Sequence, residues 1–214
     1  MKEQWTVIEI PHFQAEPWLL KKHYAKRLPM IRYAFGLYSD DTLVGVCTFG
    51  YPPNYNFNDG KFVFEGYNCL TLELNRLVVN DDLPKNSLSF FVSRCLKALP
   101  TPSCVVSYAD PNHGHHGYIY QATNWIYTGV STPKHRYIFE DGSEFDIRRG
   151  IDAKGVVVNK ILLEPTHRYI YLNGNKRDLK QMMSHFKIAR LPYPKGQNTH
   201  YDTSGFIATQ GVML

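Results

Sequence analysis

The sequence predicts an α/β domain of the α+β kind, with a mixed, partly parallel central sheet that carries helices on both faces. Strand-like and helix-like segments follow in the order β-α-β-β, a long loop, then β-α-β-α-β-β. The two strand–helix–strand units in this order require crossover connections, which make part of the sheet parallel. The 214 residues, 43% of them hydrophobic, suffice for one such core. No window approaches the roughly 18 consecutive apolar residues of a membrane span.

The first fifty residues predict a strand, a helix and a hairpin. Residues 5–10 alternate between apolar and polar side chains and end at Pro11, as a short strand does. Residues 14–27 (QAEPWLLKKHYAKR) have the spacing of an amphipathic helix. Residues 33–38 and 43–49 are apolar runs joined by Ser-Asp-Asp-Thr, which indicates a β-hairpin.

The next fifty residues predict a flap, a central strand and a second helix. The stretch 52–66 (PPNYNFNDGKFVFEG) is rich in Pro, Asn and Gly, which is typical of a loop, and we interpret it as a flap over a site. Strict alternation over residues 69–79 (CLTLELNRLVV) predicts a central strand. Residues 87–99 (SLSFFVSRCLKAL) predict a helix with Ser87 as its N-cap.

The third quarter of the chain continues the alternation. Residues 104–109 predict a buried strand, and residues 118–124 predict a helix that follows the tight loop 110–117. Residues 126–131 and 136–139 predict two further strands.

After residue 140 the pattern weakens. Two stretches are strand-like and one is helix-like, at residues 155–163, 169–172 and 176–186. We therefore predict a core over residues 1–140, with the flap at 52–66, and a basic C-terminal extension over residues 141–214 that packs on the same domain.

The positive charge lies in the last two fifths of the chain. Residues 1–130 carry 11 Lys and Arg against 11 Asp and Glu, whereas residues 131–214 carry 13 against 8, which gives the net charge of +5. Basic residues there stand beside aromatic ones, which suits a nucleic acid, because Lys and Arg neutralise phosphates and rings stack on bases. An ordinary solvated surface is the alternative. With two flap tyrosines, the candidates for contact with a nucleic acid are Tyr51, Tyr55, Lys134, Arg136, Arg148, Arg149 and Arg168.

The cysteines and the N-terminus favour a reducing compartment. The four cysteines form no CxxC pair, and most lie in apolar strand or helix patterns, so we expect buried free thiols rather than disulfides. The start, MKEQWTVIEIPHF, lacks the basic region, apolar stretch and small-residue cleavage site of a signal peptide. We expect a cytoplasmic protein.

The first candidate site is the strand–turn–helix segment 74–89. A strand that feeds a helix N-terminus directs free backbone N–H groups and the helix dipole at one point, which suits a phosphate or a developing oxyanion. Arg76, Lys85, Ser87 and Ser89 would add donors there. An ordinary connection with a capping serine is the alternative reading.

The second candidate site is the segment 107–124 (SYADPNHGHHGYIYQATN), which gathers histidines, an aspartate and tyrosines after a buried strand. Such a cluster can supply a general acid or base near neutral pH. His113, His115 and Asp110 could chelate a metal, but no fourth ligand stands at a familiar spacing, so we predict no metal site. Capping of a helix by Asp110 or Asn112 is compatible with either role.

The sequence resembles the phage Mom family of DNA-modification proteins, a divergent branch of the GNAT-type acyltransferase fold. Four segments carry the resemblance: KKHYAKR (21–27), LNRLVVNDDLPKNSLS (74–89), VSYADPNHGHHGYIYQATNWIYTG (106–129) and LPYPK (191–195). GNAT proteins normally carry [QR]-x-x-G-x-[GA] before the helix that follows this strand, to hold coenzyme A. This chain has no glycine there and two acidic residues.

The resemblance implies an enzyme that converts the N6 amine of adenine in phage DNA to a carbamoylmethyl-type group, which protects the DNA from host restriction. It implies double-stranded DNA as partner, the host cytoplasm as compartment, and an acyl donor that is either acetyl-coenzyme A or a glycyl-type donor such as aminoacyl-tRNA. The family's functional positions correspond to His23, Tyr24, Arg76, Ser89, Asp110 and Tyr120, with Arg76, Lys85, Ser87, Leu88 and Ser89 on the donor.

The expected mechanism begins with extrusion of the base, because N6 is paired and stacked in the duplex. Asp110 would accept the amine proton, and Tyr120 would protonate the leaving group or hold the acyl carbonyl. Arg76 would orient the donor. Flap aromatics would receive the base, namely Tyr51, Tyr55 and Phe57.

Three other functions remain open from the sequence. One is a GNAT-type N-acetyltransferase that acts on a protein or small-molecule amine, and another is a non-catalytic nucleic-acid-binding protein. An adenine methyltransferase comes last, because Tyr51 replaces the Asp or Asn of a [DN]-P-P-[YF] loop and no cofactor motif stands near it.

Overall fold

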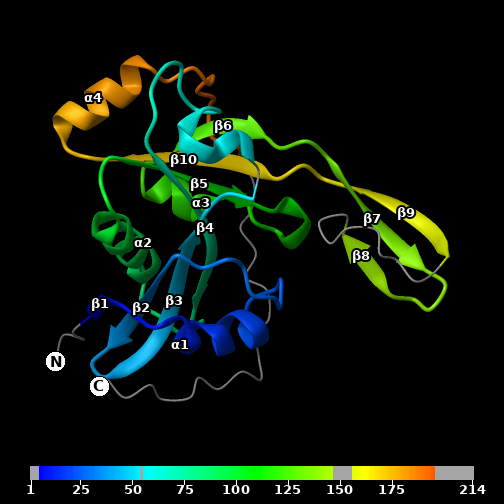
Figure 1. Ribbon diagram of the computed structural model, residues 1–214. Coiled ribbons are helices and arrows are strands. Elements are labelled where there is room, and N and C mark those ends of the chain that lie inside the picture. The colour runs from blue at the N-terminus through cyan, green and yellow to red at the C-terminus, as the bar shows by residue number, and fades with distance from the viewer. Residues whose placement is uncertain (1–4, 54, 147–155, 196–214) are drawn as a thin grey trace.

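The computed structural model describes residues 5–53, 55–146 and 156–195, and its centre is a mixed seven-stranded sheet (Figure 1). Its strands, in spatial order, are β1 (Trp5–Glu9), β2 (Tyr33–Ser39), β3 (Thr42–Gly50), β4 (Leu70–Val79), β5 (Ser103–Ala109), β10 (His167–Asn173) and β6 (Ile126–Val130). A separate three-stranded sheet has the order β8 (Glu144–Asp146), β7 (Lys134–Phe139) and β9 (Val157–Leu163).

The strand directions confirm the predicted mixed, partly parallel sheet. Among the described residues β4 and β5 form the parallel pair, and the other paired strands are antiparallel. The first predicted crossover is therefore β4–α2–β5, with α2 at Ser87–Ala98. The second predicted unit, β5–α3–β6, is interrupted, because β10 lies between its strands and pairs with both.

Helices cover both faces of the sheet, as predicted. Leu72 and Leu74 of β4 point to one face, where α2 and α3 (Tyr118–Ala122) bury Phe91 and Tyr120. On the opposite face α1 (His12–Pro17) and the π-helix η1 (Trp18–Lys22) pack on β2 and β3. The same face carries α4 (Lys176–Ser184), whose Met182 packs on β5 and β10.

The first helix differs from the predicted range 14–27. It begins at His12 and ends at Lys22. Pro17 has no N–H to donate, and from Trp18 the chain continues as a π-helical turn. This turn ends where the His23 N–H donates to the Trp18 carbonyl (3.0 Å). His23 is extended (φ −71°, ψ 136°), so it and Tyr24 lie just after the helix rather than within it.

The predicted N-cap of the second helix is wrong. The N-cap of α2 is Asn86, in the left-handed conformation (φ 73°), and the Ser87 hydroxyl donates to the Pro84 carbonyl (2.6 Å) instead of capping the helix. The stretch 52–66 contains the 3-10 helix η2 (Tyr55–Gly60), and Phe57, predicted to receive the base, is instead 3% exposed in a core cluster with Phe64.

The predicted hairpin is confirmed as β2 and β3, which pair antiparallel, and the predicted central strand as β4. The cysteines described are free thiols, with Cys47, Cys95 and Cys104 buried. None of the helices in the described residues combines the length and apolar character that a membrane crossing needs.

The C-terminal part of the chain is divided between two places. Strand β10 completes the central sheet beyond the boundary predicted at residue 140, whereas β7, β8 and β9 form an arm that stands away from the body (Figure 1). The LPYPK motif returns to the body: Leu191 donates its N–H to the Tyr127 carbonyl (3.0 Å), and the Tyr193 hydroxyl donates to the Trp125 carbonyl (2.7 Å).

Candidate active site in the strand wedge

The two central parallel strands separate and leave a wedge between them. Strands β4 and β5 pair only from Leu70–Ser103 to Glu73–Val106, and beyond this point each continues without the other. On its other side β4 contains a bulge, since Thr48 faces Arg76 and Phe49 faces Leu74, which leaves Asn75 as an extra residue. A bulge bends its strand, so the local structure of β4 contributes to the opening.

The wedge holds a cavity of about 700 Å3, which we name the strand-wedge cavity. Its walls are the end of β4, the first turn of α2, the end of β5, the loop before α3, and residues 22–24. All the predicted catalytic and donor-binding residues line it: His23, Tyr24, Arg76, Lys85, Ser87, Leu88, Ser89, Asp110 and Tyr120. Segments up to about a hundred positions apart in sequence therefore meet at one site.

A chain of two hydrogen bonds forms the floor of the cavity. Ser107, which is buried, donates its hydroxyl proton to the Leu74 carbonyl (2.8 Å) and lies 2.7 Å from the Tyr120 hydroxyl. Because a serine has one proton to donate, it serves one of these two acceptors at a time, and when it donates to Tyr120 the phenol proton is left for another acceptor. Burial raises the pKa of Tyr120 well above its usual value, so this phenol stays protonated.

His23 is held as a neutral imidazole at the rim of the wedge. It is 5% exposed, and its Nδ1 accepts the Ala25 N–H (3.0 Å), which leaves the ring proton on Nε2. Burial, and next the positive charge of Arg76, lower the pKa of His23 to about 3. At neutral pH His23 therefore presents an N–H donor and cannot act as a base through Nε2.

Tyr24 joins the segment after η1 to the second predicted site through its ring. Its centroid lies 4.3 Å from that of His23 on one side and 4.3 Å from that of His113 on the other, with His115 at 5.7 Å. The loop after β5 is thus packed against the segment after η1. Among the described residues no group of three or more His, Cys, Asp or Glu side chains is placed to hold a metal ion.

Asp110 is fixed at the end of β5 by its own turn. Its Oδ1 accepts the backbone N–H of Asn112 (3.0 Å) and the Asn112 side-chain amide (2.8 Å). Asn112 also exchanges two hydrogen bonds with the backbone of Glu164, at 3.0 and 3.1 Å. The carboxylate is therefore tied to the segment that leads from the arm into β10.

The first turn of α2 offers backbone donors rather than hydroxyl donors. The Ser87 hydroxyl donates to the Pro84 carbonyl and the Ser89 hydroxyl to the Asn86 carbonyl (2.9 Å), so neither proton is free for a ligand. An α-helix leaves its first N–H groups without intrahelical partners, and here these belong to residues that line the cavity. Asn86 adopts the left-handed turn that a glycine commonly supplies.

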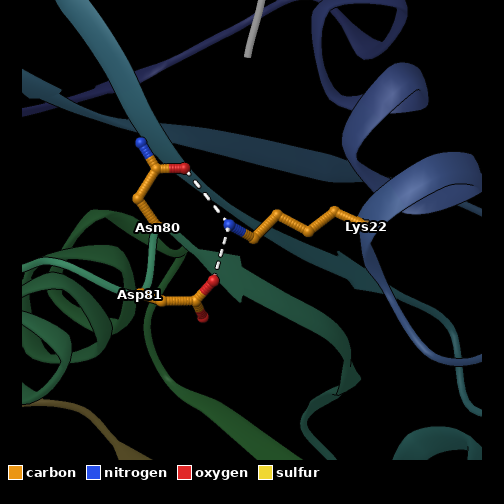
Figure 2. Close-up of polar contacts among 3 residues, drawn as sticks. All are labelled: Lys22, Asn80 and Asp81. Carbon is orange, nitrogen blue, oxygen red and sulfur yellow. Dashed lines mark hydrogen bonds and ion pairs between the residues drawn. The ribbon is translucent and has the colours of Figure 1, made fainter. Parts of the chain in front are cut away.

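Lys22 connects the first helix to the loop in front of α2 (Figure 2). Its Nζ lies 3.3 Å from Asn80 Oδ1 and 3.4 Å from Asp81 Oδ2, while the lysine side chain is 5% exposed. One of the two acidic residues that replace the expected glycines therefore has a structural partner. The loop that leads to Lys85 is anchored by this contact.

A second cavity, which we name the proline-loop cavity, meets the first at Asn75 and Arg76. It encloses about 730 Å3 and is bounded by residues 27–30, residues 51–53, Asp59 and the first half of β4. Tyr51, a predicted DNA contact, lines it. Phe57 was expected beside Tyr51 but is buried in the core, and the Tyr55 side chain lies outside the described residues.

The other predicted DNA contacts are dispersed. Lys134 and Arg136 lie on β7 of the arm, where Arg136 forms an ion pair with Glu144 (3.1 Å). Arg168 is directed elsewhere: its guanidinium donates to the side chain and carbonyl of Thr128 (3.0 and 2.8 Å), so it ties β10 to β6. Arg148 and Arg149 lie outside the described residues.

Fold and site together define an α+β protein whose separated central strands hold a cavity lined by histidine and tyrosine side chains among apolar ones. Residues 4–195 match the Mom protein family, and the chain belongs to this family. Over 113 residues it is 38% identical to the methylcarbamoylase Mom of Escherichia phage Mu. That match covers 50% of this chain and 46% of the phage Mu protein, so the chain spans about half the length of this relative.

Two solved structures also align with the fold. An acetyltransferase of the GNAT family from Bacillus cereus aligns with a TM-score of 0.45 and 11% identity, over 80% of this chain and 99% of that chain. The acetyltransferase yncA from Salmonella typhimurium, solved with its cofactor acetyl-CoA, aligns with a TM-score of 0.47 and 10% identity, over 80% and 95% of the two chains.

Three residues of the site lie within the predicted segments but were not singled out from the sequence. Ser107 lies in a buried strand pattern, Lys22 reads as a solvated helix lysine, and Asn75 has no mark of a bulge in the sequence. Of these, only Lys22 carried a usable signal, because helical spacing places it four residues after Trp18, on the apolar face.

Proposed function

We propose that this protein modifies the N6 amine of adenine in DNA by transferring an activated acyl-type group to it, which gives an N6-acyl adduct that protects phage DNA in the host cytoplasm; with a glycyl donor this adduct is an isomer of the carbamoylmethyl group. The observation that supports this most is the meeting of Arg76, Asp110 and Tyr120 at one cavity. Membership of the Mom family and the name of the phage Mu relative agree with it.

The proposed transfer begins with attack of N6 on the activated carbonyl carbon of the donor. The N6–carbon bond forms, and the bond between that carbon and its carrier breaks. One amine proton passes to Asp110, and the carrier leaves with the proton of Tyr120. Tyr120 then regains a proton from solvent and Asp110 releases the amine proton to solvent, while the Ser107 hydroxyl keeps the phenol oriented.

Charge that develops on the carbonyl oxygen requires fixed donors. Arg76 and the backbone N–H groups of Leu88 and Ser89 line the same cavity as Tyr120 and supply them. His23, neutral with its proton on Nε2, is a further donor at this rim.

The donor is proposed to be an activated acyl group on a phosphate-containing carrier. The first turn of α2 suits phosphate because Leu88 and Ser89 line the cavity at a helix N-terminus, where N–H groups and the helix dipole favour anions, and Lys85 adds a positive charge. A coenzyme A thioester and an aminoacyl-tRNA share this chemistry. Acetyl-coenzyme A would give an acetyl increment on adenine, and a glycyl donor would give the composition of a carbamoylmethyl group.

The test is nucleoside mass spectrometry on DNA from cells that express the protein. Wild type should yield an N6-substituted deoxyadenosine, whose mass identifies the donor class. Asp110→Asn and Tyr120→Phe should fold and yield none, because the proton acceptor and the acid are gone. Asp41→Asn in the β2–β3 turn and Tyr171→Phe on β10, both outside the cavities, should behave as wild type. Wild-type levels of modification in Asp110→Asn would remove that residue from the mechanism.

A further inference from the structure

We propose that the proline-loop cavity receives the extrahelical adenine, while the strand-wedge cavity holds the donor. This proposal rests on the DNA-modifying function above. It assigns the two halves of the reaction to two separate cavities that meet at Asn75 and Arg76.

The mouth of the proline-loop cavity is lined by apolar side chains that solvent reaches. Leu28 is 45% exposed, Met30 73% and Tyr51 49%, and all three line this cavity with Pro29 and Pro53. Large exposed apolar side chains gathered at one concave place mark a binding surface. Flat apolar faces and an aromatic ring suit a purine, which stacks on such groups once it has left the duplex.

The lining of the cavity also carries the polar groups that a purine edge requires. Asp59 and Glu73 supply carboxylate oxygens, and Arg27 supplies N–H donors. The N6 amine of adenine is a hydrogen-bond donor and N1 is an acceptor, so both have complementary partners in this lining. Hypoxanthine has a carbonyl oxygen in place of the amine and would meet the same carboxylates with an acceptor.

The cavity is rigid at the point where it joins the wedge. The Thr48 hydroxyl donates to Asn75 Oδ1 (2.7 Å), and Asn75 Nδ2 donates to the Met30 carbonyl (3.0 Å). The bulge residue therefore holds the wall formed by residues 27–30 against β3 and β4. Gly50 permits this approach, because a Cβ there would lie 2.0 Å from the Met30 carbonyl oxygen. A preformed wall does not have to be ordered when the base enters.

The boundary shared by the two cavities is where the amine and the donor carbonyl would meet. Arg76 lines both cavities, and its Nη1 donates to the Asn75 carbonyl, which keeps the guanidinium next to the bulge. An amine at the inner end of the proline-loop cavity would reach this boundary from one side, and the activated carbonyl from the other. The nucleophile and the donor could then enter and leave independently.

The test compares three duplexes of one sequence at one salt concentration: a central adenine paired with thymine, the same adenine opposite an abasic site, and hypoxanthine opposite an abasic site. A protein that extrudes its target base binds unpaired adenine more tightly, because the cost of unpairing is already met. Wild type should bind the duplex with unpaired adenine about tenfold or more tightly than the duplex with paired adenine. It should also bind unpaired adenine more tightly than unpaired hypoxanthine.

Leu28→Trp should fill the cavity mouth and bring the preference for unpaired adenine close to one, without changing affinity for the paired duplex. The matched control is Leu20→Trp, because Leu20 is 44% exposed on η1 and lines neither cavity. Tyr51→Leu should reduce the preference by about fivefold or more through lost stacking, and Tyr51→Phe should restore it.

The outcomes separate this proposal from the proposed function. A wild type without preference for unpaired adenine, or a Leu28→Trp variant that keeps it, overturns the cavity assignment. Wild-type N6 modification by Leu28→Trp also overturns it, while the function stands. A wild type that shows the preference and loses it in Leu28→Trp, yet modifies no DNA in cells, supports the cavity assignment and contradicts the function.

Discussion

The neutral state of His23 predicts a loss of stability in mild acid that one substitution should remove. In the unfolded chain this histidine has its ordinary pKa of 6.5, whereas in the folded protein burial and Arg76 lower the pKa to about 3. Between these two values the unfolded state binds a proton that the folded state does not. Stability is therefore complete above pH 6.5 and falls as the pH falls toward 3.

The size of the effect follows from these two pKa values. Integrating the difference in bound protons from pH 7 to pH 5 gives a loss of about 2 kcal/mol from His23 alone. His23→Asn is the informative change, because Asn Oδ1 can accept the Ala25 N–H as Nδ1 does, in the geometry of an Asx turn. Asn does not titrate in this range, so the variant should lack this part of the pH dependence.

The assay is urea unfolding at pH 7 and pH 5 for wild type, His23→Asn and His12→Asn, the last being an exposed histidine on α1. Wild type and His12→Asn should lose about 2 kcal/mol more than His23→Asn between the two pH values. Burial also lowers the pKa of His167, and the comparison among variants cancels its contribution. Equal losses in wild type and His23→Asn would refute the assignment of a neutral, buried imidazole.

Three further substitutions test the site. Ser107→Ala should destabilise the protein by about 1–3 kcal/mol, because the buried Leu74 carbonyl and Tyr120 hydroxyl lose a hydrogen-bond partner. It should also lower kcat by a larger factor than it changes KM, because Tyr120 loses its orientation, and Ser107→Thr should restore kcat. A change in KM alone would contradict this role. Lys22→Met should change the free energy of unfolding by less than about 1 kcal/mol, since an apolar side chain of similar length replaces a buried ammonium. It should nevertheless raise KM for the donor, because the loop before α2 loses its contact with Lys22. An unchanged KM would argue against this role of Lys22. Gly50→Ala should destabilise the protein by about 1–3 kcal/mol in thermal unfolding, because its Cβ would collide with the Met30 carbonyl. An unchanged stability would mean that residues 27–30 can move away from β3.

The sequence by itself determined the elements whose signal is local. The hairpin β2–β3, the strand β4 and the helix α2 follow from apolar periodicity, because the face of each element must be buried whatever packs on it. The two strand ends were also identified as candidate sites from local pattern, since a strand that ends before a helix places polar residues at one edge. The motif resemblance added His23 and Tyr24, for which periodicity gave no reason.

The tertiary structure decided what depends on partners far away in the chain. Strand β10 lies between β5 and β6, where Tyr169 packs in the core cluster on one face of the sheet and Ile170 in the cluster on the other. Phe57 lies in the core cluster around Phe64 rather than in the predicted base pocket. The wedge, its Ser107 floor and the cavity beside it arise where β4 and β5 lose their pairing, and no local pattern carries that information, because it is a relation between two strands rather than a property of either.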